Sequence, residues 1–410
     1  MMRKLLSLSL LTLVVIGSLF ISLTQPAHAF SEEQRFLSEV WRIVDRAYVD
    51  DSFNNQNWWF VRQHALKQPL KTRDQTYDAI QEMLATLDDP FTRFLRPSQY
   101  RSLQMSTSGE LTGVGLQIAQ DEATGGLKVV SPVEGSPADE AGIQSRDRIL
   151  KIDGIPTTEL SLDEAAERMR GVVGSHVFLT VQHEETAPKD IDIVRDRISL
   201  NPVYTDVRSH NDTTIGYIRL SQFNANATEE VAKAINQLEQ EGAEVYVLDL
   251  RNNPGGLLQA GIDIARLWLN QGTIVYTANR YGIQDQVDAF GEAITDAPLA
   301  VLVNGGTASA SEILSGALQD NQRAVLVGEK TFGKGLIQSL YNLSDGSGLA
   351  VTVAKYETPD HHDINRLGIE PDIKIAAEPL TRRQIATDVD TQYSEALNIL
   401  TQPVALSEAR

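Results

Sequence analysis

The chain has 410 residues, too many for one average domain, so two or three globular units are expected. Its 42% hydrophobic and 22% charged residues are typical of soluble globular proteins and argue against disorder or a membrane protein with many spans. The formal net charge of −19 disfavours nucleic acid as a partner, because an acidic surface repels phosphate backbones and also anionic lipid. The absence of cysteine excludes disulfides, a cysteine nucleophile and a cysteine-ligated metal.

Residues 1–29 have the order of a secretory signal peptide. Arg3 and Lys4 precede an almost wholly apolar run, Leu5–Leu23, and the small-residue site Ala27-His28-Ala29 follows. Cleavage before Phe30 predicts an exported protein and takes the net charge from −19 to −21. A retained membrane anchor is the alternative, because 19 residues could just span a bilayer.

The segment 30–97 is expected to form a small helical region, because apolar residues recur at helical spacing in 31–49 and 73–87. The pattern then changes to short strands separated by Gly and Pro. We therefore expect a separate β-rich unit over residues 98–195.

Residues 196–380 alternate between short apolar strands and helices, which predicts a mostly parallel sheet with helical crossovers. The reactive loops of such a sheet gather at the carboxyl ends of its strands. Residues 381–410 are expected to be a polar, partly helical tail. The strands are expected at Val245–Leu250, Leu299–Val303 and Ala324–Val327, and helices at 257–269 and 309–320.

Ser309 lies where the strand Leu299–Val303 leads into a helix. The N–H groups of a helix start have no intrahelical partner, so they can stabilise the oxyanion formed when a nucleophile attacks a carbonyl. An ordinary capping box of Ser309 and Glu312 explains the same residues. Gly255, in the Pro-Gly-Gly turn after another strand, could supply a second oxyanion donor together with Ala310, or could belong to a simple turn.

Lys334 follows the third strand, among glycines, Phe332, Leu336 and Ile337. Apolar neighbours disfavour the charged amine, and a lysine base needs its pKa lowered by about 3 units to work near neutral pH. Gln338 would lie one turn away if the segment were helical, and could then orient the amine. The alternative is a surface loop lysine.

Other catalytic arrangements find no support in the sequence, which has no Gly-x-Ser-x-Gly elbow, no His-Glu-x-x-His and no phosphate-binding Gly-Lys-Ser/Thr loop. The adjacent His361, His362 and Asp363 could suggest a metal site, but neighbouring residues on an extended chain point apart. No metal or organic cofactor is expected.

Together these segments resemble the carboxyl-terminal processing, or tail-specific, peptidases over nearly all of the chain after residue 29. The resemblance rests on Thr307–Glu312 (TASASE) and Phe332–Gly335 (FGKG). It implies an α/β protease core with a sheet like that of ClpP and crotonase. It also implies a serine endopeptidase with Ser309 as nucleophile, Lys334 as base, Gln338 beside them, and an oxyanion hole made by the N–H groups of Gly255 and Ala310. Thr307 stands where the family usually has serine.

Residues 105–195 resemble an inserted PDZ domain. Such a domain captures the free C-terminus of a protein substrate on successive N–H groups while the peptide adds a strand. Arg146 stands where the family often has a turn glycine. Arg170 matches a residue implicated in coupling the PDZ and protease domains of relatives. The carboxylate-binding loop corresponds to Gly113, Val114, Gly115 and Leu116.

The segment Lys355–Asp372 looks most like enzymes of cyanobacteria and chloroplasts that trim the C-terminal extension of the photosystem II D1 precursor in the thylakoid lumen. The resemblance implies a location in the thylakoid lumen or periplasm and allows a membrane-associated substrate. A general periplasmic tail-specific protease is one alternative. A non-catalytic binding protein on the same fold is another, which the presence of Ser309 and Lys334 disfavours. The cleavage motif and the oligomeric state stay open.

Overall fold

The computed structural model describes residues 30–401, except 122–124, 134, 185, 283, 377–379 and 382. The expected signal peptide and the last residues of the expected tail lie outside the described residues. The chain divides into two compact units: one ends at Arg96 but also includes Leu340–Val351, and the other contains Pro97–Ser339 and the residues from Thr352 onward. Within the described ranges, no helix is long and apolar enough to cross a bilayer.

Among its described residues the first unit contains three helices; helical stretches were expected at 31–49 and 73–87, and the short helix between them was not predicted. They are α2 (Glu32–Ala47), α3 (Trp58–Ala65) and α4 (Arg73–Ala85). Each helix starts at a polar cap whose side chain accepts a hydrogen bond from an N–H group three residues on. Strand β1 (Arg93–Leu95) pairs antiparallel with Gly348–Ala350, the start of β18 (Gly348–Glu357). A piece of chain distant in sequence therefore completes this unit.

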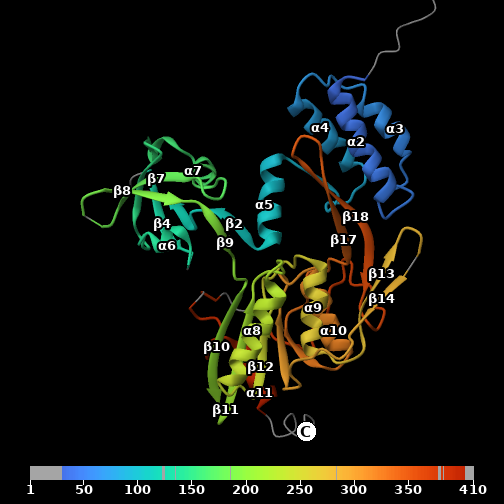
Figure 1. The fold of residues 1–410 in the computed structure, drawn as a ribbon. Coiled ribbons are helices and arrows are strands. Elements are labelled where there is room, and N and C mark those ends of the chain that lie inside the picture. Colours follow the sequence, from blue (N-terminus) through green and yellow to red (C-terminus); the bar gives the residue numbers. More distant parts are fainter. Residues whose placement is uncertain are drawn as a thin grey trace, which may run out of the picture. The chain divides into compact units, whose positions relative to one another are not determined.

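The second unit begins with helix α5 (Pro97–Ser108), and a β-rich domain with its own apolar core follows (Figure 1). Strand β2 (Glu110–Gly113) pairs with β9 (Asp196–Ser199). Because β3 lies at the edge of the main sheet, a peptide can add to it as a further strand. The sheet has the order β3 (Leu116–Gln120), β4 (Leu127–Pro132), β5 (Arg148–Ile152), β7 (His176–Gln182), β8 (Lys189–Val194), with β6 (Ile155–Pro156) beside β5; the helices are α6 (Pro137–Glu140) and α7 (Leu162–Met169).

A six-stranded sheet forms the core of the rest of this unit, and the three predicted strands are its central members. Only its first pair is antiparallel; every other neighbouring pair is parallel. The order is β10 (Val203–His210), β11 (Thr213–Leu220), β12 (Val245–Asp249), β15 (Leu299–Val303), β16 (Ala324–Gly328), β19 (Ile373–Lys374). The parallel strands therefore bring the loops that follow β12, β15 and β16 to one edge.

Two apolar layers cover this sheet, because successive strand residues point to opposite faces. Tyr246 and Leu248 belong to the layer of α8 (Ala227–Gln240), α9 (Leu258–Trp268) and α10 (Ala310–Asp320), which lie together in Figure 1. Val245 and Val247 belong to the layer of α11.

Helix α11 (Thr391–Leu400) corrects the expectation of a polar tail that begins at residue 381. Tyr393, Ala396, Leu397 and Leu400 are buried in the second apolar layer. Their helical spacing places them on one face, so this helix is part of the core. Polar residues between them hid that face in the sequence.

A smaller antiparallel sheet holds β13 (Thr273–Asn279) between β14 (Gln284–Asp288) and Ala354–Glu357 of β18. Strand β17 (Leu336–Asn342) pairs with β18. Gln338 therefore does not lie one helical turn from Lys334, because the segment that contains it is a strand and the condition of a helix is not met.

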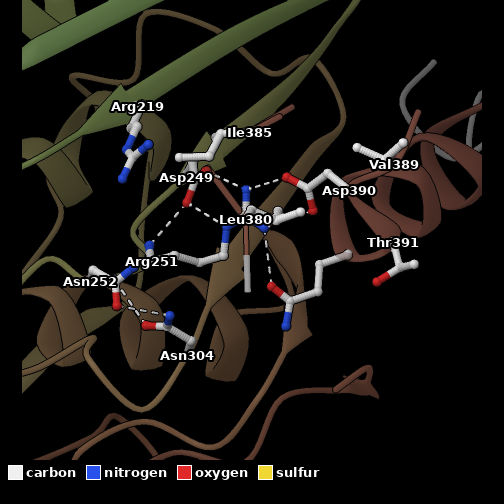
Figure 2. A pocket seen from close by; sticks show the side chains of 11 residues that line it. Arg219, Asp249, Arg251, Asn252, Asn304, Leu380, Ile385, Val389, Asp390 and Thr391 are labelled. Carbon is white, nitrogen blue, oxygen red and sulfur yellow. Dashed lines mark hydrogen bonds and ion pairs between the residues drawn. The ribbon is translucent and has the colours of Figure 1, made fainter. Parts of the chain in front are cut away.

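A buried ion network ties the end of β12 to the start of α11. The Arg251 guanidinium lies 2.6 Å from a carboxylate oxygen of Asp249 and 2.8 Å from one of Asp390. It also donates to Gln392 at 3.1 Å. Figure 2 shows this network beside a cavity of about 370 Å³ at the carboxyl ends of β11, β12 and β15. Charge pairing as well as apolar contact therefore attaches α11 to the sheet.

We expect Asp390→Asn to destabilise the fold by about 3 kcal/mol at neutral pH, because breaking a buried ion pair costs about 3–5 kcal/mol. Burial opposes ionisation of Asp390, but the hydrogen bonds and charge of Arg251 lower its pKa below the usual value. A pKa lowered by folding adds stability above the unfolded-state value of about 3.9, and this contribution is lost as the pH falls through the folded pKa.

Urea unfolding at a series of pH values measures this effect. Wild type should lose more stability than Asp390→Asn as the pH falls below about 4. The exposed Asp388→Asn serves as the matched control and should follow wild type. Identical acid profiles for the two variants would contradict the role of Asp390.

Candidate active site

The loops after β12, β15 and β16 meet at the carboxyl edge of the parallel sheet. The Ala308 N–H donates to the Asn253 carbonyl at 3.0 Å, which joins the first loop to the second. The Phe332 N–H donates to the Thr307 carbonyl at 3.0 Å, which joins the second to the third. The segments that carry the predicted nucleophile, base and oxyanion donors are therefore neighbours.

Ser309 sits directly before α10 in a strained turn. Its φ is +60°, a conformation that residues other than glycine seldom adopt and that costs about 1–3 kcal/mol. The Ser309 N–H donates to the Glu312 carboxylate at 2.8 Å, and the Glu312 N–H donates to the Ser309 carbonyl at 2.8 Å. Both hydrogen bonds use the main chain of Ser309. The helix cap that the sequence predicts therefore does not require the serine hydroxyl, and the two interpretations of Ser309 are compatible.

The buried Glu312 carboxylate holds the nucleophile loop and the lysine loop together. Besides the Ser309 N–H, it accepts hydrogen bonds from the Gly333 N–H at 2.7 Å and the Lys334 N–H at 2.9 Å. The Thr331 hydroxyl is a fourth donor. Since Glu312 is fully buried, these four donors are its compensation for leaving water. The sequence indicated Glu312 only as a helix cap.

Tyr356 on β18 holds the same two residues from their carbonyl side. Its hydroxyl lies 3.1 Å from the Ser309 carbonyl oxygen and also contacts the Lys334 carbonyl oxygen. Burial, with a smaller contribution from Glu312, raises the pKa of Tyr356 well above its usual value. Tyr356 therefore stays a neutral donor and is unsuited to be the base. Glu312 and Tyr356 together bring the main chains of Ser309 and Lys334 to one place.

Two close approaches of the backbone explain the glycines around Lys334. A Cβ atom on Gly333 would lie 2.9 Å from the Gly368 nitrogen, and one on Gly335 would lie 2.8 Å from the Asn365 nitrogen. Lys334 itself is half-buried. Gln338 lies on β17, and its amide nitrogen is 3.5 Å from the Thr352 hydroxyl. The lysine loop is thus wedged against the chain at 365–368.

Gly255 packs directly against the nucleophile turn. Its φ is +91°, and a Cβ atom there would lie 2.6 Å from the Ala308 carbonyl oxygen. The Gly255 N–H donates to the Asn253 side-chain oxygen at 2.9 Å, so in this conformation it is engaged. Ala310 is the first residue of α10, and its N–H has no intrahelical partner. Gly255 and Ala310 are the two expected oxyanion donors. The Gly255 N–H would act only after its hydrogen bond to the Asn253 side chain opens.

Ser311 and Thr307 are structural links between the loops. The Ser311 hydroxyl donates to the Asn253 carbonyl at 3.0 Å, and the Thr307 hydroxyl donates to the Leu250 carbonyl at 2.9 Å. Both side chains are fully buried. Threonine in place of the family's usual serine therefore keeps the hydroxyl that the loop needs.

The predicted carboxylate-binding loop has its carbonyl groups engaged and its N–H groups available. The Val114 carbonyl accepts from the Ala138 N–H at 2.9 Å, and the Gly115 carbonyl accepts from the Val133 N–H at 2.8 Å. Within the described residues, the N–H groups of Val114 and Gly115 have no hydrogen-bond partner. Gly113 ends β2 and Leu116 begins the edge strand β3. This arrangement suits capture of a peptide carboxylate.

Two arginines noted in the sequence lie in this β-rich domain. Arg170 directly follows α7, lies 3.1 Å from a Glu167 carboxylate oxygen, and is close to the carboxylate loop, because a Cβ atom on Gly113 would lie 3.3 Å from its Cα. Arg146 has a φ of +76°, the left-handed conformation that the family's glycine favours. The turn keeps that conformation despite the substitution.

The histidine pair makes contacts of its own. His361 Nδ1 lies 3.0 Å from a Glu357 carboxylate oxygen, and its ring stacks on Tyr276 with centroids 4.2 Å apart. In the part of the chain that the structure describes, no group of three or more His, Asp or Glu side chains could hold a metal ion.

Comparison with known proteins gives matches over the whole chain. The Peptidase family S41 profile matches residues 214–375, and a PDZ domain profile matches 128–183. A carboxyl-terminal-processing protease of Picosynechococcus is 58% identical over 409 residues, covering 100% of this chain and 99% of that protein. The chloroplastic carboxyl-terminal-processing peptidase 2 of Arabidopsis thaliana is 47% identical over 361 residues, covering 85% and 70%. A solved photosystem II D1 C-terminal processing protease matches with a TM-score of 0.57 and 40% identity, covering 92% of this chain and 99% of that one.

The chain therefore belongs to Peptidase family S41, with a peptidase domain, a PDZ domain and an N-terminal helical region. Within that family it is a carboxyl-terminal-processing protease, a serine peptidase that cleaves protein chains at their C-termini. The fold and the peptidase activity expected from the sequence are confirmed.

We expect Glu312→Gln to fold but to lower kcat about a hundredfold. A glutamine amide has one acceptor oxygen and would turn an NH₂ group toward main-chain donors, and a displacement of reacting groups by about 1 Å can cost that much. Peptide cleavage assays with circular dichroism check this. The exposed Glu292→Gln is the matched control. An unchanged kcat in Glu312→Gln would show that the carboxylate is not needed to position the two loops.

Proposed function

We propose that this protease removes the C-terminal extension of the photosystem II D1 precursor, with Ser309 as nucleophile and Lys334 as base. The observation that carries the catalytic part is the shared anchoring of these two residues by Glu312 and Tyr356. The substrate is supported by the similarity to a solved photosystem II D1 C-terminal processing protease and to cyanobacterial and chloroplastic relatives.

In the proposed mechanism, neutral Lys334 removes the proton of the Ser309 hydroxyl as its oxygen attacks the scissile carbonyl carbon. The Ala310 N–H stabilises the resulting oxyanion, joined by the Gly255 N–H once its bond to Asn253 opens. The protonated amine of Lys334 then gives its proton to the leaving nitrogen. Water hydrolyses the acyl-enzyme by the reverse proton transfers. Gln338 orients the amine from β17.

The PDZ domain supplies the preference for chain ends. The free carboxylate of the substrate binds the N–H groups of the loop Gly113–Leu116, and the preceding residues pair with the edge strand β3. Arg170 lies beside this loop and couples its occupation to the protease domain. The same chemistry allows a membrane-associated protein as substrate, provided that its C-terminal tail is accessible.

We assign the protein to the thylakoid lumen or periplasm. The order of residues 1–29 favours export, and the similar proteins are cyanobacterial and chloroplastic.

Incubating the purified protein with a photosystem II D1 precursor and locating the cut by mass spectrometry tests the substrate. One cut that releases the extension is expected. Cleavage of unrelated tails without cleavage of the precursor would favour a general periplasmic tail-specific protease. Absence of turnover on any tail would favour a binding protein on the same fold.

We expect Ser309→Ala and Lys334→Ala each to abolish turnover while leaving thermal unfolding unchanged within a few degrees. Each variant removes one of the two groups that make and break bonds. Ser311→Ala should retain much more activity, because its hydroxyl only links two loops. Single-turnover assays with a labelled peptide separate the three variants. Equal loss in Ser311→Ala and Ser309→Ala would mean that the wrong serine has been assigned.

Amidating the substrate's C-terminus should lower kcat/KM about tenfold or more, because hydrogen bonds to a charged group are worth about 1.5–3 kcal/mol. Competition between matched free and amidated peptides measures the ratio. Arg170→Ala should lower activity on both peptides, whereas the exposed Arg168→Ala should not. Equal cleavage of free and amidated peptides would refute carboxylate recognition.

A further inference from the structure

A cavity with an excess of arginine lies on the N-terminal helices, and none of the residues assigned to catalysis lines it. It measures about 390 Å³ and is lined by Phe30, Arg35, Ser38, Glu39, Arg42 and Arg62. Arg35 and Arg42 are seven residues apart on α2, so they share one face of that helix. Arg62 lies on α3. Three guanidinium groups against one carboxylate give this cavity a charge of about +2 in a chain whose net charge is −19.

The arginines of this cavity lack anionic partners. In the described ranges, neither the Arg35 nor the Arg42 side chain has a hydrogen bond or an ion pair. Arg62 donates to the Ser38 hydroxyl at 3.2 Å and lies 5.0 Å from the Trp41 ring centroid. Its Nε is buried without a hydrogen-bond partner. A buried donor without an acceptor is costly, and guanidinium groups match phosphate oxygens in geometry. The cavity is therefore suited to an oxyanion.

Exposed aromatic rings accompany the arginines. Phe30, Trp59 and Phe60 are 48%, 52% and 62% exposed, and the last two rings contact each other. Trp59 lies three residues before Arg62 on α3, which places the two on adjacent positions of the helix surface. Rings at such exposure next to arginine are typical of surfaces that meet the interface of a membrane.

The position of α3 is firmly held, so these rings are not exposed by a loose helix. The Trp41 indole N–H donates to the Trp58 carbonyl at 2.9 Å, and the Trp58 indole N–H donates to the Trp41 carbonyl at 3.3 Å. Trp58 is buried and stacks on Phe53. The reciprocal bonds fix α3 against α2 and keep Trp59 turned outward.

We propose that the cavity binds the phosphate headgroup of an anionic lipid, with Trp59 and Phe60 inserted into the interface of the bilayer. Charge complementarity supports this occupant, because the cavity is positive and the headgroup is negative. The positive charge is local, since the chain as a whole is acidic. A second copy of the chain fits less well, because a two-fold contact centred on this cavity would bring its arginines close to those of the other copy.

Co-sedimentation with vesicles tests the proposal on the chain that begins at Phe30, because the apolar leader would itself bind lipid. This chain should bind vesicles of phosphatidylcholine with phosphatidylglycerol and not phosphatidylcholine alone. Arg35→Gln with Arg42→Gln should weaken binding about 30-fold, at about fivefold for each arginine near an anionic surface. Trp59→Ser should weaken it without a change in charge. Arg101→Gln with Arg146→Gln removes the same charge elsewhere and should bind better than the cavity variant.

Three results would overturn the proposal. Equal loss of vesicle binding in the cavity variant and the control variant would show that net charge alone explains the binding. Binding of inorganic phosphate in a thermal-shift assay without binding to vesicles would make the cavity a site for small anions. A dimer in sedimentation velocity that Arg35→Gln with Arg42→Gln dissociates, again without vesicle binding, would make it a contact between copies. Cleavage of a soluble peptide should be unchanged in every variant, which separates this test from that of the proposed function.

Discussion

The four hydrogen bonds accepted by the Glu312 carboxylate are the constraint on which the catalytic edge depends. A buried carboxylate is stable only when donors replace its hydration, and here the donors come from two loops that follow different strands. The need to satisfy one charge thereby dictates where Ser309 and Lys334 stand. Tyr356 repeats the constraint through the carbonyl groups of the same two residues. The hydrogen bonds that replace the hydration of Glu312 are thus the same bonds that position the main chains of Ser309 and Lys334.

The parallel sheet positions the loops that supply these hydrogen-bond donors. Parallel strands deliver three loops to one edge, and close packing there leaves room only for glycine at Gly255, Gly333 and Gly335. Helix α11 packs on one face of the sheet, and a buried ion pair between Arg251 and Asp390 attaches its start at this edge. A chain without disulfides thus uses internal charge pairs to secure a segment near its end.

The central strands could be predicted from the sequence because buried parallel strands are short continuous apolar runs, and Leu299–Val303 was predicted to the residue. The motifs around Ser309 and Lys334 made both residues candidates, and the structure brings the two loops that carry them together. A partly helical tail was expected, but the burial of α11 was not, because its apolar face is interrupted by polar residues. Tyr356 left no signal, since its contacts lie 47 and 22 residues away in the chain. The conformation at Gln338 stayed open in the sequence, because spacing alone cannot distinguish four residues of helix from four residues of strand.

The occupied N–H of Gly255 has a consequence for how the enzyme meets its ligands. Under the proposed mechanism, the Asn253 side chain already accepts a hydrogen bond from this donor, so a molecule that mimics the tetrahedral intermediate would first displace an internal acceptor. Such inhibitors would show slow onset, with a rate set by the protein and not by their own diffusion.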